Sequence, residues 1–188
     1  MNIKHSIILG LFIFVSVTIL TSCGGGAVRS ETALKNFSKE IERGNLDNLR
    51  LKIYYMNPSL LTFFAVSVED LINSEEDDQL QKFVIDGNSL EEHIELLKQV
   101  ENITLLPVKD ESYINARIYY VFETNKGQKL FDVTMWGYVE GMDVVDEKCM
   151  YINGFAFEEN DIFYDLILPF LPEDEANTME GYKQENQE

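Results

Sequence analysis

Histidine and cysteine are scarce in this chain of 188 residues, which contains two of each: His5, His93, Cys23 and Cys149. Structural zinc sites take four ligands, mostly from these residue types, and many catalytic zinc sites take two or three histidines. The segment that holds His5 has the features of a cleaved export signal, described below, so one histidine is expected in the mature chain. The composition therefore excludes a zinc site within one chain that uses several cysteines or two histidines.

Basic residues are also few, with 15 Lys and Arg against 33 Asp and Glu, and the formal net charge is −18. A domain with this charge is repelled by nucleic acid and by anionic lipid headgroups. We therefore expect no nucleic-acid partner, and we expect the acidity to keep the protein soluble. A protein, a peptide or a glycan remains as the class of partner.

The chain has no apolar run long enough to span a bilayer. The uncharged apolar segment 7–20 is shorter than the roughly 20 residues that a transmembrane helix requires. Lys4 and His5 precede this segment and the small residue Ser22 follows it, an order that is typical of a cleaved export signal. We therefore interpret residues 1–22 as a signal peptide and not as a membrane-spanning anchor.

The signal ends in Leu20-Thr21-Ser22-Cys23, which resembles the lipobox of bacterial lipoproteins. The resemblance implies cleavage between Ser22 and Cys23, lipidation of the Cys23 thiol with diacylglycerol, and acylation of the new N-terminus. The protein would then be held at the extracytoplasmic face of the cell membrane, because each buried methylene adds about 0.8 kcal/mol and two or more acyl chains hold firmly. A lipidated Cys23 leaves Cys149 without an intramolecular disulfide partner.

The mature chain is long enough for one domain with a hydrophobic core. Gly24-Gly25-Gly26 and the polar residues that follow predict a flexible tether over 23–32. We expect one globular domain over 33–172. The acidic and polar composition of residues 173–188 predicts a disordered tail.

Apolar periodicity predicts an α+β fold. Apolar spacings of three and four predict a helix that begins at Glu31 and ends near Gly44 and a second helix over 89–100, and capping residues with a closing proline predict a short helix over 162–170. Two-residue alternation and turn signals predict strands over 49–55, 81–86, 114–123, 129–138, 149–152 and 155–157, with an edge strand over 103–108. Asn153-Gly154 predicts a type I′ turn. Strands that follow a helix and are joined by hairpins indicate an antiparallel sheet with helices packed on one face.

Five strings within residues 50–172 resemble those of small lipoproteins from Gram-positive-type bacteria that carry an uncharacterised C-terminal domain. They are SVEDLINS, DGNSLEEHIELL, ARIYYVFET, LFDVTMWG and NGFAFEENDIFYDLILPFLP. The resemblance implies one domain after the anchor. It implies no activity, because the strings contain no catalytic signature.

Aromatic residues of the predicted strands provide a candidate binding surface. Tyr119, Trp136 and Tyr138 lie where an open sheet face would bring aromatic side chains together, and Tyr54 and Tyr55 are further candidates. Such a surface is typical of sites that bind a peptide or glycan. Packing in the core is the alternative for each residue.

No catalytic motif is present, so we expect a non-enzymatic, lipid-anchored binding module at the cell surface, without a cofactor. The alternative is a carboxylate-based hydrolase that acts on envelope or exogenous glycan, since such enzymes need two acids across a sugar-binding cleft. The residues for this chemistry would be the acids Asp132, Asp143, Asp146 and Glu147, beside Trp136 and Tyr138.

Two further types of site were considered. Cys149 and His93 could form the nucleophile and base of a cysteine hydrolase, but no local motif supports this pair, and a buried structural cysteine is favoured. The acidic runs 143–147 and 158–161 offer oxygen ligands for calcium without the spacing of an EF-hand loop. We expect helix capping and solvation to explain both runs.

Overall fold

The computed structural model describes residues 24–58, 60, 62–74, 79–108, 115–136 and 149–185. In this part of the chain, six strands form one sheet in the order β2-β1-β3-β4-β5-β6, and each neighbouring pair is antiparallel. The strands are β1 (Leu49–Met56), β2 (Leu80–Asp86), β3 (Ala116–Thr124), β4 (Lys129–Trp136), β5 (Cys149–Ile152) and β6 (Phe155–Glu158). The predicted α+β fold is confirmed.

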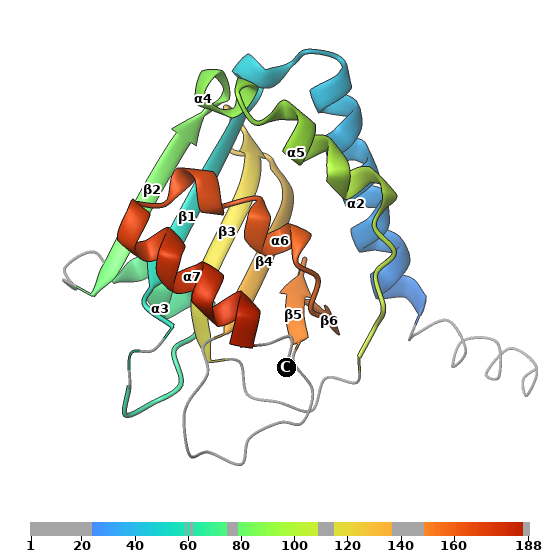
Figure 1. Ribbon diagram of the computed structural model, residues 1–188. Coiled ribbons are helices and arrows are strands. Elements are labelled where there is room, and N and C mark those ends of the chain that lie inside the picture. The colour runs from blue at the N-terminus through green and yellow to red at the C-terminus, as the bar shows by residue number, and fades with distance from the viewer. Residues whose placement is uncertain are drawn as a thin grey trace, which may run out of the picture.

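Most of the described helices lie on one face of the sheet (Figure 1). They are α2 (Gly24–Glu42), α5 (Ile94–Lys98), α6 (Ile162–Asp165) and α7 (Glu173–Glu185), with the 3₁₀ turns η2 (Gln99–Asn102) and η3 (Leu168–Phe170). At one end of the sheet lie α4 (Gly87–Glu91) and the 3₁₀ turn η1 (Leu46–Asn48). The short helix α3 (Val68–Asn73) is an exception, because its Leu71 packs with Tyr54 and Met56 on the other face.

Side-chain alternation divides the sheet into two faces. The core face carries residues such as Ile53, Tyr120 and Phe122, which are fully buried against the helices. At its centre, the Phe37 ring of α2 lies 4.7 Å from that of Phe122 and 5.0 Å from that of Phe131. We call the opposite side the polar face; its residues include Arg50, Lys52 and Tyr54 of β1, Lys82, Val84 and Asp86 of β2, Tyr119, Val121 and Glu123 of β3, Asp132 and Thr134 of β4, and Tyr151 of β5.

The hairpin turns follow the sequence signals. Asn153 and Gly154 have φ values of 53° and 79°, as the type I′ prediction requires. The segment predicted as an edge strand over 103–108 forms a single bridge, Pro107 to Phe157, beside β6. Its Leu106 carbonyl accepts a hydrogen bond from the Glu158 amide at 2.9 Å, so it does lie at the edge of the sheet.

The predicted tether over 23–32 is wrong for residues 24–32, which form the first half of helix α2. The Ser30 hydroxyl is buried and donates to the Ile152 carbonyl at 3.1 Å, and the Glu31 carboxylate accepts from the Leu105 amide at 3.3 Å. A Cβ at Gly26 would meet the Phe155 ring. Gly26 and Ser30 therefore serve close packing of the helix against the sheet. Cys23 lies outside the described residues.

The predicted disordered tail over 173–188 is wrong for residues 173–185, which form helix α7. Its first turn contains three acidic residues, which the positive end of the helix dipole stabilises. Met179 is fully buried in the core, and Lys183 reaches the Asp165 carboxylate at 2.7 Å. Met179 and the polar contacts around it therefore keep this segment folded on the core, although its composition is typical of a disordered segment.

The helix predicted over 89–100 is divided into α4, α5 and η2, and it begins earlier, at Gly87. Gly87, its first residue, packs directly against the backbone of Leu46, where a Cβ would overlap the carbonyl group. The expected apolar residues Leu90, Leu97 and Val100 are fully buried.

Gly87→Ala is therefore expected to lower the free energy of unfolding by about 1–3 kcal/mol, the usual range for overpacking. Gly181→Ala in α7 is the matched control, because no atom lies within 4 Å of the added methyl group. The control should be neutral or gain up to about 1 kcal/mol, because alanine favours helix. Urea unfolding of the mature chain measures both, and equal stabilities would contradict the close contact at Gly87.

Candidate functional site

The register of the sheet sets basic and acidic side chains opposite each other on the polar face. Arg50 of β1 lies between Asp86 of β2 and Glu123 of β3. Its guanidinium is 3.5 Å from the Asp86 carboxylate and 3.9 Å from Glu123, and Lys52 contacts the same Glu123 oxygen at 2.7 Å. Opposite charges directly across neighbouring strands stabilise the pairing of β2, β1 and β3.

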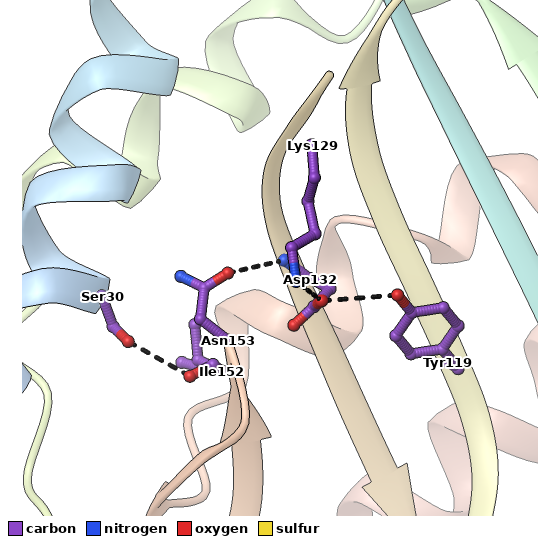
Figure 2. A network of polar contacts seen from close by, with 6 residues as sticks. All are labelled: Ser30, Tyr119, Lys129, Asp132, Ile152 and Asn153. Atoms are coloured by element: carbon purple, nitrogen blue, oxygen red, sulfur yellow. Dashed lines mark hydrogen bonds and ion pairs between the residues drawn. The ribbon is translucent and has the colours of Figure 1, made fainter. Parts of the chain in front are cut away.

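A second polar network joins β3, β4 and the β5–β6 turn (Figure 2). The Tyr119 hydroxyl donates to the Asp132 carboxylate at 3.3 Å, and the Lys129 ammonium contacts the same oxygen. The Asp132 amide donates to the Asn153 side-chain oxygen at 3.2 Å, and the Asn153 amide donates to the Asp132 carbonyl at 3.1 Å. The network fixes the turn against β4.

Burial raises the pKa of the Tyr119 phenol well above its ordinary value, and the neighbouring Asp132 carboxylate raises it further. The phenol therefore remains a protonated hydrogen-bond donor at neutral pH. Burial also raises the pKa of Tyr55, whose side chain lies on the core face near Glu175, and that of the fully buried Tyr120. None of these three phenols has the lowered pKa that a tyrosine base requires.

The structure describes only part of the predicted aromatic surface. Tyr119 is half-buried, and its ring lies 5.8 Å from that of the buried Tyr54, over which the Lys82 ammonium sits at 5.0 Å. Trp136 is the last residue of β4, and Tyr138 lies outside the described residues. The surface formed by Tyr119, Trp136 and Tyr138 therefore stays a prediction.

The candidate catalytic groups are not brought together where the structure describes them. Cys149 is buried among polar-face residues such as Tyr151, whereas the His93 ring packs on Phe170, 4.9 Å away, on the helix-covered side. The sheet thus separates the proposed nucleophile from its base. Asp132 is held by Lys129 and Tyr119, and the other predicted acids, Asp143, Asp146 and Glu147, lie outside the described residues.

Among the residues that the structure describes, no three His, Cys, Asp or Glu side chains are grouped so that they could hold a metal ion. The acidic run 158–161 caps and braces helix α6. The Asn160 side chain accepts from the Ile162 amide at 3.1 Å, and Glu159 accepts from the Tyr164 hydroxyl at 2.9 Å. The run 143–147 lies outside the described part of the chain.

A cleft of about 360 Å³ opens at the end of the sheet where β1 begins. Its lining combines two carboxylates, a guanidinium and two amides, and contains no aromatic ring. The lining residues are Asp47, Leu49, Arg50, Asp86, Gly87, Asn88 and Asn125. Arg50 belongs both to the cleft and to the polar face, so the two surfaces are continuous.

Four separate segments form this cleft: η1, the start of β1, the β2–α4 junction and the β3–β4 turn. The Asn125 amide donates to the Asn48 carbonyl at 2.7 Å, which holds the turn beside η1. The cleft was not predicted from the sequence, because no local pattern shows that β1 lies between β2 and β3. The one available signal was Asp86-Gly87-Asn88, where a glycine between two polar residues marks a close approach of the backbone.

Within the described ranges, none of the helices combines the length and the apolar character that a membrane crossing requires. No protein-family model, curated protein or solved structure matches this chain. The resemblances to lipoproteins noted in the sequence therefore stay expectations.

The raised pKa values of Tyr55, Tyr119 and Tyr120 predict a loss of stability in alkali. The folded state keeps protons that the unfolded state releases above about pH 10, so the free energy of unfolding falls as the pH rises through that region. In a spectrophotometric titration, these three phenols should ionise only when the protein unfolds.

Tyr119→Phe tests this assignment. The variant should remove one phenol from the late phase that accompanies unfolding, and the amplitude of the early phase should not change. A smaller early phase would show that Tyr119 titrates in the folded protein, contrary to its burial and its contact with Asp132.

Proposed function

We propose that this protein is a lipid-anchored, extracytoplasmic binding module that takes a polar ligand, such as part of a glycan or a peptide, in the cleft between η1, α4 and the β3–β4 turn. The lipobox-like Leu20-Thr21-Ser22-Cys23 supports the anchor. The cleft is the observation that carries the binding role, because a volume of about 360 Å³ falls in the range of small-molecule sites.

The position of the cleft suits a ligand that arrives from outside the cell. Helix α2 has 19 residues and rises about 28 Å, and β1 then returns antiparallel to it. The segments that line the cleft, at α4 and the start of β1, therefore lie at the end of the domain opposite the N-terminal end of α2 (Figure 1). Gly24, the first residue of α2, is next to the proposed lipid attachment. An anchored domain would present this end away from the bilayer.

The chemistry of the lining suits a ligand with many hydrogen-bonding groups. Asn88 and Asn125 offer both donors and acceptors, Asp47 offers acceptors, and Arg50 offers donors. Although the chain carries a net charge of −18, the cleft and the adjoining polar face carry equal numbers of basic and acidic residues, so a neutral ligand meets little repulsion there. The basic residues are Arg50, Lys52, Lys82 and Lys129, and the acidic residues are Asp47, Asp86, Glu123 and Asp132.

A glycan hydrolase is the second candidate, because the two carboxylates of Asp47 and Asp86 line one cleft. Hydrolysis requires one acid that holds its proton and one that is ionised. The Asp86 carboxylate lies 3.5 Å from the Arg50 guanidinium and forms an ion pair with it. Asp47 lies in the open, polar lining of the same cleft.

The anchor is tested by comparing the wild type with Cys23→Ala by membrane fractionation and intact mass. We expect the wild type in the membrane fraction with the added mass of a diacylglycerol, and we expect the variant to lack this mass and to leave the membrane. A wild type that is soluble and unlipidated would overturn the lipoprotein assignment.

Ligand binding is tested with the mature Cys23→Ala domain and insoluble envelope glycan from the same cells. Asn88→Trp fills the cleft with a large ring, and Asn177→Trp on the exposed side of α7 is the matched control. The fraction that sediments with the glycan should fall severalfold for Asn88→Trp and stay unchanged for Asn177→Trp.

Equal sedimentation of the two variants would exclude the cleft as the glycan site. Release of reducing sugar ends by the wild type, abolished by Asp47→Asn or Asp86→Asn, would instead support the hydrolase. A domain that binds without releasing sugar ends would support the binding module.

A further inference from the structure

Phe63 and Phe64 are the most exposed large apolar side chains among the described residues, with exposed fractions of 102% and 85%. Single exposed apolar residues are common, but two adjacent phenylalanines on a loop mark a contact surface. Residues 57–68 contain no charged side chain, although the chain as a whole has a net charge of −18. This loop is therefore suited to an uncharged, apolar environment.

A buried arginine holds the base of the loop. Arg117 is 1% exposed, and its guanidinium donates to the Leu60 carbonyl at 3.0 Å and to the Thr62 hydroxyl at 2.9 Å. It also donates to the Asn115 side-chain oxygen at 3.0 Å, which accepts the Val66 amide at 3.0 Å. These bonds fix both sides of the loop to β3, so the two rings project from a defined position.

The loop lies at the same end of the domain as Gly24. Helix α2 leads away from Gly24, β1 returns to Met56, and the loop follows directly (Figure 1). Val28, on the first turns of α2, is 63% exposed and adds a third apolar side chain near this end. The polar cleft lies at the opposite end.

No flexible linker lies between this end of the domain and the proposed lipid. Gly24 is already helical, and the buried Ser30 ties α2 to β5 through the Ile152 carbonyl. Cys23 is joined to Gly24 by one peptide bond, so acyl chains on Cys23 would hold this end of α2 at the bilayer surface. The domain would have little freedom to tumble above the membrane.

We propose that Phe63 and Phe64 insert into the interface of the bilayer that carries the Cys23 lipid, so that the domain stands with its polar cleft outward. This inference rests on the proposed anchor. Phenylalanine side chains of proteins that lie on a membrane surface are buried at the boundary between the headgroups and the acyl chains. The acyl chains supply the lasting attachment, whereas the phenylalanines form a second contact and thereby fix the orientation of the domain.

The test uses the full-length lipidated protein in phosphatidylcholine vesicles, with p-benzoylphenylalanine in place of Ala65 as a photo-crosslinker. Ala65 is exposed beside the two rings. A second preparation carries the crosslinker in place of Lys126, an exposed residue of the β3–β4 turn at the far end. After irradiation, intact mass should show phospholipid adducts at position 65 and essentially none at position 126.

The double substitution Phe63→Ser/Phe64→Ser is made in the protein that carries the crosslinker at position 65. It tests whether the two rings insert into the bilayer or only lie near it. The rings are almost fully exposed, so the fold is unaffected, and most of the phospholipid adduct should be lost. A lipidated, vesicle-bound protein whose adduct at position 65 survives this change, or is no greater than at position 126, would overturn the inference and leave the anchor intact. A chain that carries no diacylglycerol would overturn the anchor, and the inference with it.

Discussion

The packing of helix α2 against the sheet is the constraint on which the rest of the structure depends. Phe37 fills the centre of the core between Phe122 and Phe131, and Ser30 binds the β5 backbone at the other half of the helix. Large aromatic side chains supply much of the energy of such contacts, and the close approach requires small residues elsewhere on the helix. Because the contact runs along the helix, it fixes where residue 24 leaves the domain, and so which end of the domain faces the proposed anchor.

The two faces of the sheet differ in their chemistry. The core face of the described strands is mostly apolar, with exceptions such as Gln81 of β2, whereas the polar face pairs charges across β2, β1 and β3. The Arg50–Asp86 ion pair contributes little to stability, because water screens the exposed Asp86 carboxylate. The ion pairs of the polar face hold hydrogen-bond donors and acceptors in place. Arg50 is part of these pairs and also lines the cleft.

Local patterns predicted those elements that local forces determine. The alternation of Tyr119 and Val121 with Tyr120 and Phe122 gave β3 its two faces, and Asn153-Gly154 gave the turn. Helix α7 was missed because its order depends on one buried residue, Met179, and the start of α2 was missed because glycine favours both flexibility and close packing. The cleft could not be predicted, since its residues meet only through the strand order, which no local pattern specifies.

The direction of the chain connects these features. An antiparallel helix and strand, α2 and β1, bring the chain back to the end where it started, so uncharged residues and the N-terminal end of α2 share one end of the domain. The same geometry leaves the segments that turn between α2, β1, β2 and β3 at the other end, where the polar cleft forms. Because no flexible linker precedes α2, the length of α2 sets the distance of the cleft from the proposed anchor. With a rigid helix in place of a flexible tether, the domain would reach less far from the membrane, but its ligand site would keep a constant orientation.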